Sequence, residues 1–390
     1  MESCLTPSSA PSGRTFFSRL EPGALPPAKF HQPSGLSNAD GAPVSKRWCG
    51  RFERRAGWTP MLRSLVIIWA LVVVPWSFRE ASAQQLFIEK AEANTALIDA
   101  MYVKGLSFLT KGQSEDGLWA DTYGRQPGVL GLCIVAMLAH GDDPNVGPYA
   151  LTIRRALNAL LKLQSAETGY LGNSMYNHGF GTLALAEAYG AVDDARIGPA
   201  LQRAVNLIVA SQSRNQHGGW RYSPDSSDAD TTVSGAQMVA LFAARNAGLA
   251  VPEEAIQKGL KYFASCKTPE GGYGYTGATG PNAARCAIGV LVLALAKQKD
   301  TAEFKSAWQY LQVAGGESHY QQYFLYYGAQ AYFHASPDAW RKWNSANIKA
   351  LAAAQNQDGS WEGSFGPAFG TAASLLSLAL NYRFLPIYER

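Results

Sequence analysis

The sequence predicts an all-α fold, a closed (α/α)6 toroid with six outer and six inner helices. One helix–loop–helix segment recurs across residues 95–382, with aromatic anchors spaced 41 to 53 residues apart. The two helices of each unit differ in apolar pattern, as expected for an outer and an inner layer. Alternating β-branched runs are scarce, so we expect few strands.

Each unit begins with a helix that ends in Gln and continues with a Gly-rich loop that carries an aromatic residue. The aromatic follows the Gln by six residues, or by eight in the third unit. In the fourth unit Lys replaces Gln, and a degenerate unit around Trp308, Tyr310 and Tyr320 precedes the last. The five clear pairs are Gln113–Trp119, Gln164–Tyr170, Gln212–Trp220, Lys267–Tyr273 and Gln355–Trp361.

The first helix of each unit is amphipathic and the second is apolar on almost every side. Ala156, Leu160 and Leu161 form one apolar stripe, which predicts an outer helix that faces solvent. Residues 182–189, 232–245 and 283–297 predict buried inner helices. The last helix, 372–380, is equally apolar, which favours a closed ring because an open solenoid needs polar end units.

The N-terminal region has the features of a leader. The chain has 390 residues and a formal charge of +4, but only 24 basic against 25 acidic residues remain from Gln84 onward. The folded part is therefore nearly neutral, which argues against nucleic-acid binding. Residues 61–83 combine a basic start, a ten-residue apolar run and a small-x-small cleavage pattern, which predicts a signal peptide and export to the periplasm or outside the cell.

Two alternatives remain for this region. An uncleaved leader would anchor the protein in a membrane through residues 62–78, although ten apolar residues are few for a bilayer. Residues 1–60 are rich in Pro, Gly, Ser and Arg, and we expect them to be disordered, or untranslated if Met61 is the true start. We expect one toroid domain over residues 84–390.

The three cysteines that follow the leader do not suggest a metal or redox site. Cys133, Cys266 and Cys286 form no CxxC pair and no Cys/His ligand spacing. A Cys266–Cys286 disulfide is conceivable in an exported protein. No phosphate-binding loop, dinucleotide fingerprint or Ser/His/Asp motif occurs, so we predict no cofactor.

The repeated basic residue, Gln and Gly-x-aromatic pattern resembles the QW repeat of squalene–hopene and oxidosqualene cyclases. The wider resemblance is to the squalene-cyclase/prenyltransferase superfamily, and nearest to exported bacterial single-toroid squalene-cyclase-like proteins. The resemblance implies the toroid fold, with the Gln and Trp residues as scaffold, and it does not fix the activity. Full cyclases of this kind have chains about twice as long, which argues against a complete triterpene cyclase.

A second resemblance concerns chemistry. The segment Asp228-Ala229-Asp230-Thr231-Thr232 resembles the Asp-x-Asp-Asp-Thr motif of squalene–hopene-type cyclases, whose middle Asp protonates an alkene. The resemblance assigns that role to Asp230, with Asp228 beside it, although Thr231 replaces the third Asp. The alternative is that Asp230 is only the N-cap of the inner helix that starts at Thr231.

Other residues are candidates for the same site. His178, near the start of the second inner helix, is a candidate proton shuttle, and Glu187 on that helix is a candidate acid or base; both can equally be structural. Aromatic and cationic groups near the inner-helix starts are candidates for contacting a hydrophobic or anionic substrate, or for packing and pairing with loop carboxylates such as Asp121. These candidates are Trp220, Tyr222, Tyr273, Tyr275, Tyr320, Tyr323, Tyr326, Tyr327, Arg125, Arg221 and Arg285.

Three functions remain open at this stage. The first is an isoprenoid cyclase or isomerase that uses Asp230, and an apolar cavity with Asp230 pointing into it would favour it. The second is a non-catalytic toroid that binds a protein, lipid or glycan at its mouth, favoured by a filled ring with Asp230 bonded to its own helix. The third is a glycosidase, which needs a second carboxyl about 5 to 10 Å from Asp230.

Overall fold

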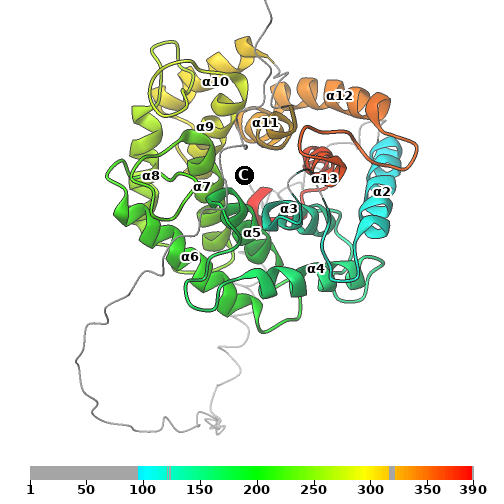
Figure 1. The fold of residues 1–390 in the computed structure, drawn as a ribbon. Coiled ribbons are helices and arrows are strands. Elements are labelled where there is room, and N and C mark those ends of the chain that lie inside the picture. The colour runs from blue at the N-terminus through cyan, green and yellow to red at the C-terminus, as the bar shows by residue number, and fades with distance from the viewer. Residues whose placement is uncertain (1–94, 121, 123, 316–320, 389–390) are drawn as a thin grey trace, which may run out of the picture. The chain divides into compact units, whose positions relative to one another are not determined.

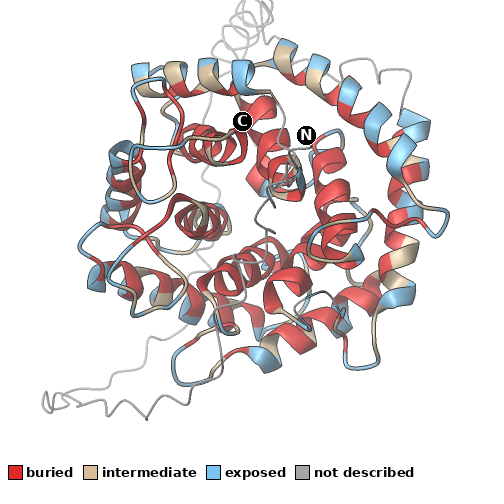
Figure 2. Ribbon diagram, turned by 45° about the horizontal axis from the view of Figure 1, so that its top comes forward, coloured by how far each residue is buried: buried red, intermediate tan, exposed pale blue. Residues whose placement is uncertain are grey.

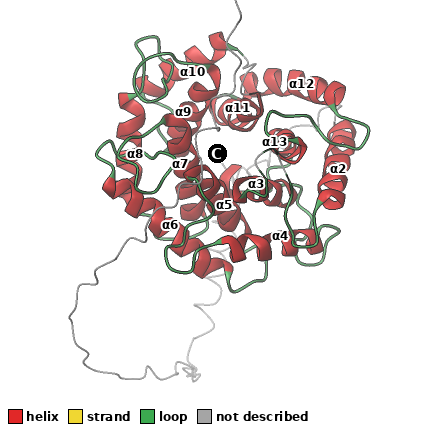
Figure 3. Cartoon of the chain, in the orientation of Figure 1, coloured by secondary structure: helices red, strands yellow, loops and turns green. Residues whose placement is uncertain are grey.

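The computed structural model describes residues 95–120, 122, 124–315 and 321–388, and these residues form an all-helical ring (Figures 1 and 3). They contain twelve α-helices, one short 3-10 helix and no strand beyond isolated bridges. The outer helices are α2 (Thr95–Gly112), α4 (Ala150–Leu163), α6 (Ile197–Arg214), α8 (Glu253–Ser265), α10 (Ala302–Ala314) and α12 (Pro337–Ala354). The inner helices are α3 (Pro127–Leu138), α5 (Met175–Ala188), α7 (Thr231–Asn246), α9 (Ala283–Leu295), α11 (Gln321–Ala335) and α13 (Pro367–Ala379).

The ring is closed, as the apolar last helix predicts. Each inner helix packs against the next around the circle, and α13 packs against α3. In the outer layer α12 contacts α2. The chain therefore forms the predicted (α/α)6 toroid, with inner and outer helices alternating along the sequence.

Burial separates the two layers as the apolar patterns predict (Figure 2). Every residue of α3 and of α5 is buried, because these helices contact neighbours on all sides. The outer helices bury one face only and expose the other, as in α4 and α8.

The repeated Gln residues join each unit to the next. The side chain of Gln212 donates to the carbonyl of Gly218 in its own loop (2.7 Å) and to that of Ala255 in the next outer helix (2.9 Å). Gln355 does the same with Gly359 and with Met101 of α2, so it closes the circle. Lys267 replaces the Gln by donating to the carbonyl of Glu303. The spacing that recurs along the sequence is thus the spacing of these Gln contacts between units.

A close backbone contact explains why the loops contain glycine. Gly117 has a positive φ of 86°, and a Cβ at that position would lie 2.3 Å from the carbonyl oxygen of Arg155. Gly359 also has a positive φ, and a Cβ there would lie 2.3 Å from the carbonyl oxygen of Lys104, where the last unit contacts the first. Any side chain here would push the loop away from the next outer helix.

Two inner helices begin earlier than their apolar patterns predict. The second begins at Met175, before the apolar run from 182 and three residues before His178, which was expected near its start. The last begins at Pro367 rather than at 372. Glycine and polar residues in the first turn of α5 hide its start, since they lower the apparent apolar periodicity.

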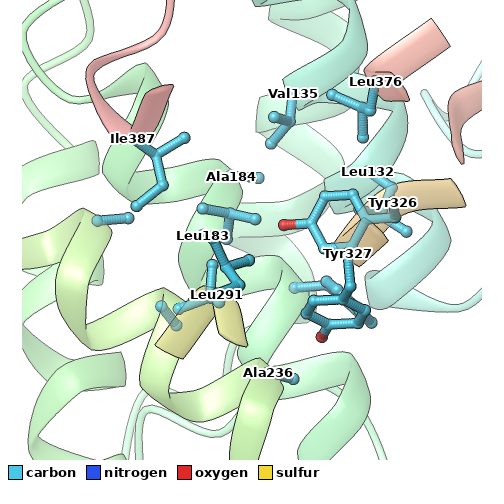
Figure 4. Close-up of a cluster of buried hydrophobic side chains, with 14 of the residues drawn as sticks. Leu132, Val135, Leu183, Ala184, Ala236, Leu291, Tyr326, Tyr327, Leu376 and Ile387 are labelled. Carbon is cyan, nitrogen blue, oxygen red and sulfur yellow. The ribbon is translucent and has the colours of Figure 1, made fainter. Parts of the chain in front are cut away.

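The C-terminal segment closes one end of the ring. After α13 the chain turns back, and its 3-10 helix η1 (Pro386–Tyr388) packs against α7, whose last residue Asn246 donates to the carbonyl of Pro386. Tyr382 donates a hydrogen bond to Asp99 of α2, 2.7 Å away. Figure 4 places Ile387 within the interior cluster that includes Leu183 and Tyr326. This end is the one at which the inner helices finish.

The predicted leader, residues 1–83, lies outside the described residues. Among the helices that the structure does describe, none combines the length and the apolar character needed to cross a membrane.

Candidate functional site

The loops that precede the inner helices meet at the other end of the ring, which we call the mouth. Backbone hydrogen bonds connect them: Met175 at the start of α5 donates to Tyr222, and Thr231 at the start of α7 donates to Tyr275. The N-termini of neighbouring inner helices therefore lie side by side at the mouth. The partial positive charge of each helix end adds there.

Asp230 is the N-cap of α7 and is completely buried. Its Oδ1 accepts hydrogen bonds from the backbone N–H groups of Thr232 (2.9 Å) and Val233 (2.8 Å) and from the Thr232 hydroxyl (2.6 Å). Its Oδ2 accepts no hydrogen bond within the described part of the chain. The cap interpretation is therefore correct for one carboxylate oxygen and leaves the other unused.

The caps of neighbouring inner helices show that the position does not require a carboxylic acid. Ser174 caps α5 and Asn282 caps α9, each by accepting one backbone hydrogen bond. Burial raises the pKa of Asp230 above its usual range, although the hydrogen bonds from Thr232 and Val233 and the nearby Arg221 lower it. The site thus holds a carboxyl group that favours the protonated form more than an ordinary aspartate.

Arg221 is the cation of this site. Its Nε lies 3.5 Å from Oδ2 of Asp228 and 3.8 Å from Oδ2 of Asp230. The guanidinium carbon lies 4.9 Å from the centre of the Tyr222 ring and 5.1 Å from that of Tyr275. The two rings thus hold the guanidinium beside Asp230, while the Asp228 side chain is 62% exposed.

Tyrosines surround Asp230 and Arg221. The hydroxyl groups of Tyr222 and Tyr275 are hydrogen-bonded to each other, and the hydroxyl of Tyr176 is hydrogen-bonded to that of Thr232. The ring of Tyr176 lies 6.1 Å from that of Tyr222 and 6.1 Å from that of Tyr323. We call Tyr176, Tyr222, Tyr275 and Tyr323 the mouth tyrosines. The sequence analysis did not identify Tyr176. The signal that could have found it is its place in the first turn of an inner helix, one residue before Asn177-His178.

Aromatic pairs cross the ring at the mouth and just below it. Tyr323 of α11 contacts Tyr176 of α5, and Tyr326 of α11 contacts Phe180 of α5 at 5.8 Å. Helices α5 and α11 lie on opposite sides of the ring, so these contacts fill part of its centre. Tyr326 and Tyr327 lie in the interior cluster (Figure 4) rather than at the mouth.

Two predicted ligand contacts, Trp220 and Tyr273, lie within the wall of the ring. The Trp220 indole donates to the carbonyl of Ile208 in outer helix α6, and only 2% of the residue is exposed. Tyr273 is fully buried between the layers, where its ring contacts Phe263 of α8 at 5.8 Å. Both side chains pack between the two layers of the ring, as the packing alternative predicts.

His178 is also built into the wall. It is completely buried, its Nδ1 accepts from the backbone N–H of Leu171, and its Nε2 lies 3.0 Å from the carbonyl of Ala204. Burial lowers its pKa to about 4. No ring nitrogen is left for a proton shuttle, which corrects that hypothesis in favour of the structural one.

Glu187 lies at the closed end, far from Asp230. It follows Tyr176 by eleven residues on α5, which is about 16 Å along a helix. It accepts a hydrogen bond from the backbone of Ile387, and burial raises its pKa to about 8. The carboxyl groups of Glu187 and Asp230 are therefore too far apart to hydrolyse a glycosidic bond together, because that reaction needs two carboxyl groups about 5 to 10 Å apart.

The remaining candidates from the sequence are Arg125, Asp121, Tyr320 and the cysteines. Arg125 pairs with Asp116, whereas Asp121 and Tyr320 lie outside the described residues. Cys266 and Cys286 are buried and form no disulfide with each other, contrary to the disulfide that the sequence made conceivable. Over the described ranges no cluster of three or more His, Cys, Asp or Glu side chains could hold a metal ion.

Comparisons with known proteins agree with this fold. Residues 127–291 match the family model described as the squalene-hopene cyclase C-terminal domain. No curated protein sequence shows significant similarity to the chain. The family match and the structural neighbours below confirm the resemblance to the squalene-cyclase-like superfamily.

Solved structures of two kinds share the toroid. The type II terpene cyclase MstE from Scytonema is 18% identical with a TM-score of 0.53, and the alignment covers 74% of this chain and 99% of that one. An MstE variant bound to its substrate geranylgeranyl dihydroxybenzoate gives a TM-score of 0.52 at 17% identity, with 74% and 98% covered. An inactive variant of the α-1,6-mannanase GH76A of Salegentibacter sp. HEL1_6, bound to α-1,6-mannotriose, gives 0.57 at 8% identity, with 72% and 98% covered. At these identities the likeness concerns the fold alone.

Proposed function

We propose that this chain is an exported, squalene-cyclase-like toroid that binds an isoprenoid at its mouth. The observation that carries the proposal is the buried Asp230 carboxyl, whose Oδ2 accepts no hydrogen bond within the described residues and lies 3.8 Å from Arg221, which in turn packs on the rings of Tyr222 and Tyr275. Aromatic faces bind apolar chains well and stabilise positive charge. The substrate of the terpene cyclase neighbour, a geranylgeranyl compound, supports the same ligand class.

The filled centre limits how the ligand binds. The contacts between α5 and α11 narrow the ring at the mouth and just below it, and the C-terminal segment closes the far end. A ligand therefore enters at the mouth and lies against its tyrosines instead of threading through the ring. A glycan is a weaker candidate, because Glu187 is too distant to serve as the second carboxyl.

Mass spectrometry of material that co-purifies with the protein tests this proposal. We expect an apolar compound of isoprenoid mass, and less of it with Tyr275→Ala, because that change removes one wall of the mouth. Tyr189→Ala is the matched control, since Tyr189 is 44% exposed at the end of α5. Recovery of an oligosaccharide or a protein instead would contradict the isoprenoid assignment.

A second candidate function is acid catalysis. The cap bonds of Asp230 and the contacts that fill part of the ring centre favour non-catalytic binding, whereas the Oδ2 of Asp230, which accepts no hydrogen bond within the described residues, and the raised pKa of this carboxyl favour catalysis. The protonated carboxyl would transfer its proton to an alkene carbon, forming a C–H bond and a carbocation. The carbocation would then lose a proton from another carbon, so that the product is an isomer of the substrate. The carboxylate left behind would be stabilised by Arg221 and by the two backbone N–H groups.

Chain length does not oppose this second candidate. The Scytonema type II terpene cyclase aligns over 99% of its length with 74% of this chain. One ring of this size is therefore enough for a terpene cyclase, and the size argument excludes only the longer triterpene cyclases.

A further inference from the structure

Two arginines approach the same tyrosine ring at the mouth. Arg221, from the loop before α7, has its guanidinium carbon 5.1 Å from the centre of the Tyr275 ring. Arg285, in the first turn of α9, has its guanidinium carbon 5.9 Å from the same centre. Both side chains are partly exposed, with 21% of the Arg221 side chain accessible. Two positive charges thus pack against the ring of Tyr275.

The acidic groups near these two arginines balance their charge only when both Asp228 and Asp230 are ionised. Arg285 donates only to the backbone carbonyls of Tyr273 and Gly280 and pairs with no described carboxylate. Nη1 of Arg221 is buried and makes no hydrogen bond within the described residues. The opposing carboxylates are Asp228, at 3.5 Å from Arg221, and Asp230, at 3.8 Å.

The state of Asp230 decides the balance. When its carboxyl is protonated, Asp228 alone opposes the two arginines. The N-termini of α7 and α9 add partial positive charge on the same side. The free oxygen of Asp230 then lies next to a region of net positive charge that also contains aromatic faces.

We propose that the isoprenoid bound at the mouth carries an oxyanion head group, held between Arg221 and Arg285. This inference rests on the proposed isoprenoid binding and specifies its ligand. Guanidinium groups bind carboxylate or phosphate oxygens through paired, charge-assisted hydrogen bonds. The hydrocarbon part then lies on the mouth tyrosines, and the partly exposed side chains of Arg221 and Arg285 contact the head group.

Two probes that differ only in the head group test the inference: farnesoic acid, which is ionised at pH 7, and farnesol, which is neutral. Calorimetric titration of the full mature chain should show the acid binding about tenfold or more tightly than the alcohol. Arg285→Gln should reduce this preference to about twofold, and Arg285→Lys should retain part of it, since the charge remains.

Arg245→Gln is the matched control. Arg245 also lies over an aromatic ring, Phe242 at 5.1 Å, but in the last turn of α7 at the closed end. The Arg245→Gln variant should keep the full preference for farnesoic acid over farnesol. All variants should melt at the temperature of the wild type. Equal binding of acid and alcohol, or a preference unchanged in Arg285→Gln, would overturn the head-group inference and leave isoprenoid binding intact. Binding of neither probe would overturn isoprenoid binding, and the inference with it.

Discussion

Replacing Glu187 with glutamine is expected to remove a loss of stability that the wild-type protein suffers as the pH rises. Burial raises the pKa of Glu187 from its usual 4.5 to about 8 in the folded state. Because the pKa of Glu187 is higher in the folded state than in the unfolded state, the contribution of this carboxyl to stability is complete below pH 4.5. That contribution is lost as the pH rises towards 8. The difference in unfolding free energy between the variant and the wild type should grow by about 4 kcal/mol over this range.

Urea denaturation at pH 4.5, 6 and 8 measures this difference. Glu167→Gln, on an exposed loop, is the control and should follow the wild type at every pH. The groups that face Glu187 are the hydroxyls of Tyr326 and Tyr388, whose pKa values burial raises, so they stay neutral throughout. Parallel curves for Glu187→Gln and the wild type would show that Glu187 is ionised and solvated in the folded protein.

Replacing Asp230 with asparagine is expected to abolish any turnover of a polyprenyl substrate while the protein melts almost unchanged. Asparagine caps helices as well as aspartate does, and Asn282 already caps α9, but an amide cannot donate a proton to an alkene. Geranylgeraniol incubated in deuterated buffer provides the readout. Wild-type protein should give an isomer with one deuterium, found by gas chromatography and mass spectrometry, and the variant should give none.

Asp230→Ala separates the two roles of the side chain. It removes both the cap and the acid, so it should lose turnover and also about 1 kcal/mol of stability. If Asp230→Asn retained the wild-type turnover, or changed only stability by about 1 kcal/mol or more, Asp230 would be a helix cap and no acid.

The fold was predictable because the Gln, glycine and aromatic residues that join one repeat to the next lie close together in sequence. The Gln, the loop glycine and the aromatic recur at six residues from Gln to aromatic, or eight in the unit of Gln212 and Trp220, and the Gln of a repeat also bonds to the next outer helix, as Gln212 does. The closed far end was not predictable, since residues 381–388 have no periodicity and find their place only through tertiary contacts with α2, α5 and α7.

The site was predictable only in part, for a related reason. Asp230, Arg221, Tyr222 and Tyr275 are close together in the folded chain because their loops precede adjacent inner helices. Trp220 and His178 follow the same sequence pattern but point into the wall, because an inner-helix start has one side facing the ring centre and another facing the outer layer. Sequence spacing does not distinguish the two sides for residues in irregular loops.

The central claim is that burial makes the Asp230 carboxyl at the mouth easier to protonate than an ordinary aspartate, so that it is more than a helix cap. The titration of its side-chain carboxyl carbon by NMR, assigned through loss of the signal in Asp230→Asn, tests this without any choice of substrate. Our account predicts a pKa above the usual 3.8 of aspartate. A simple N-cap carboxylate paired with Arg221 would titrate below 3.8, and that result would contradict the account.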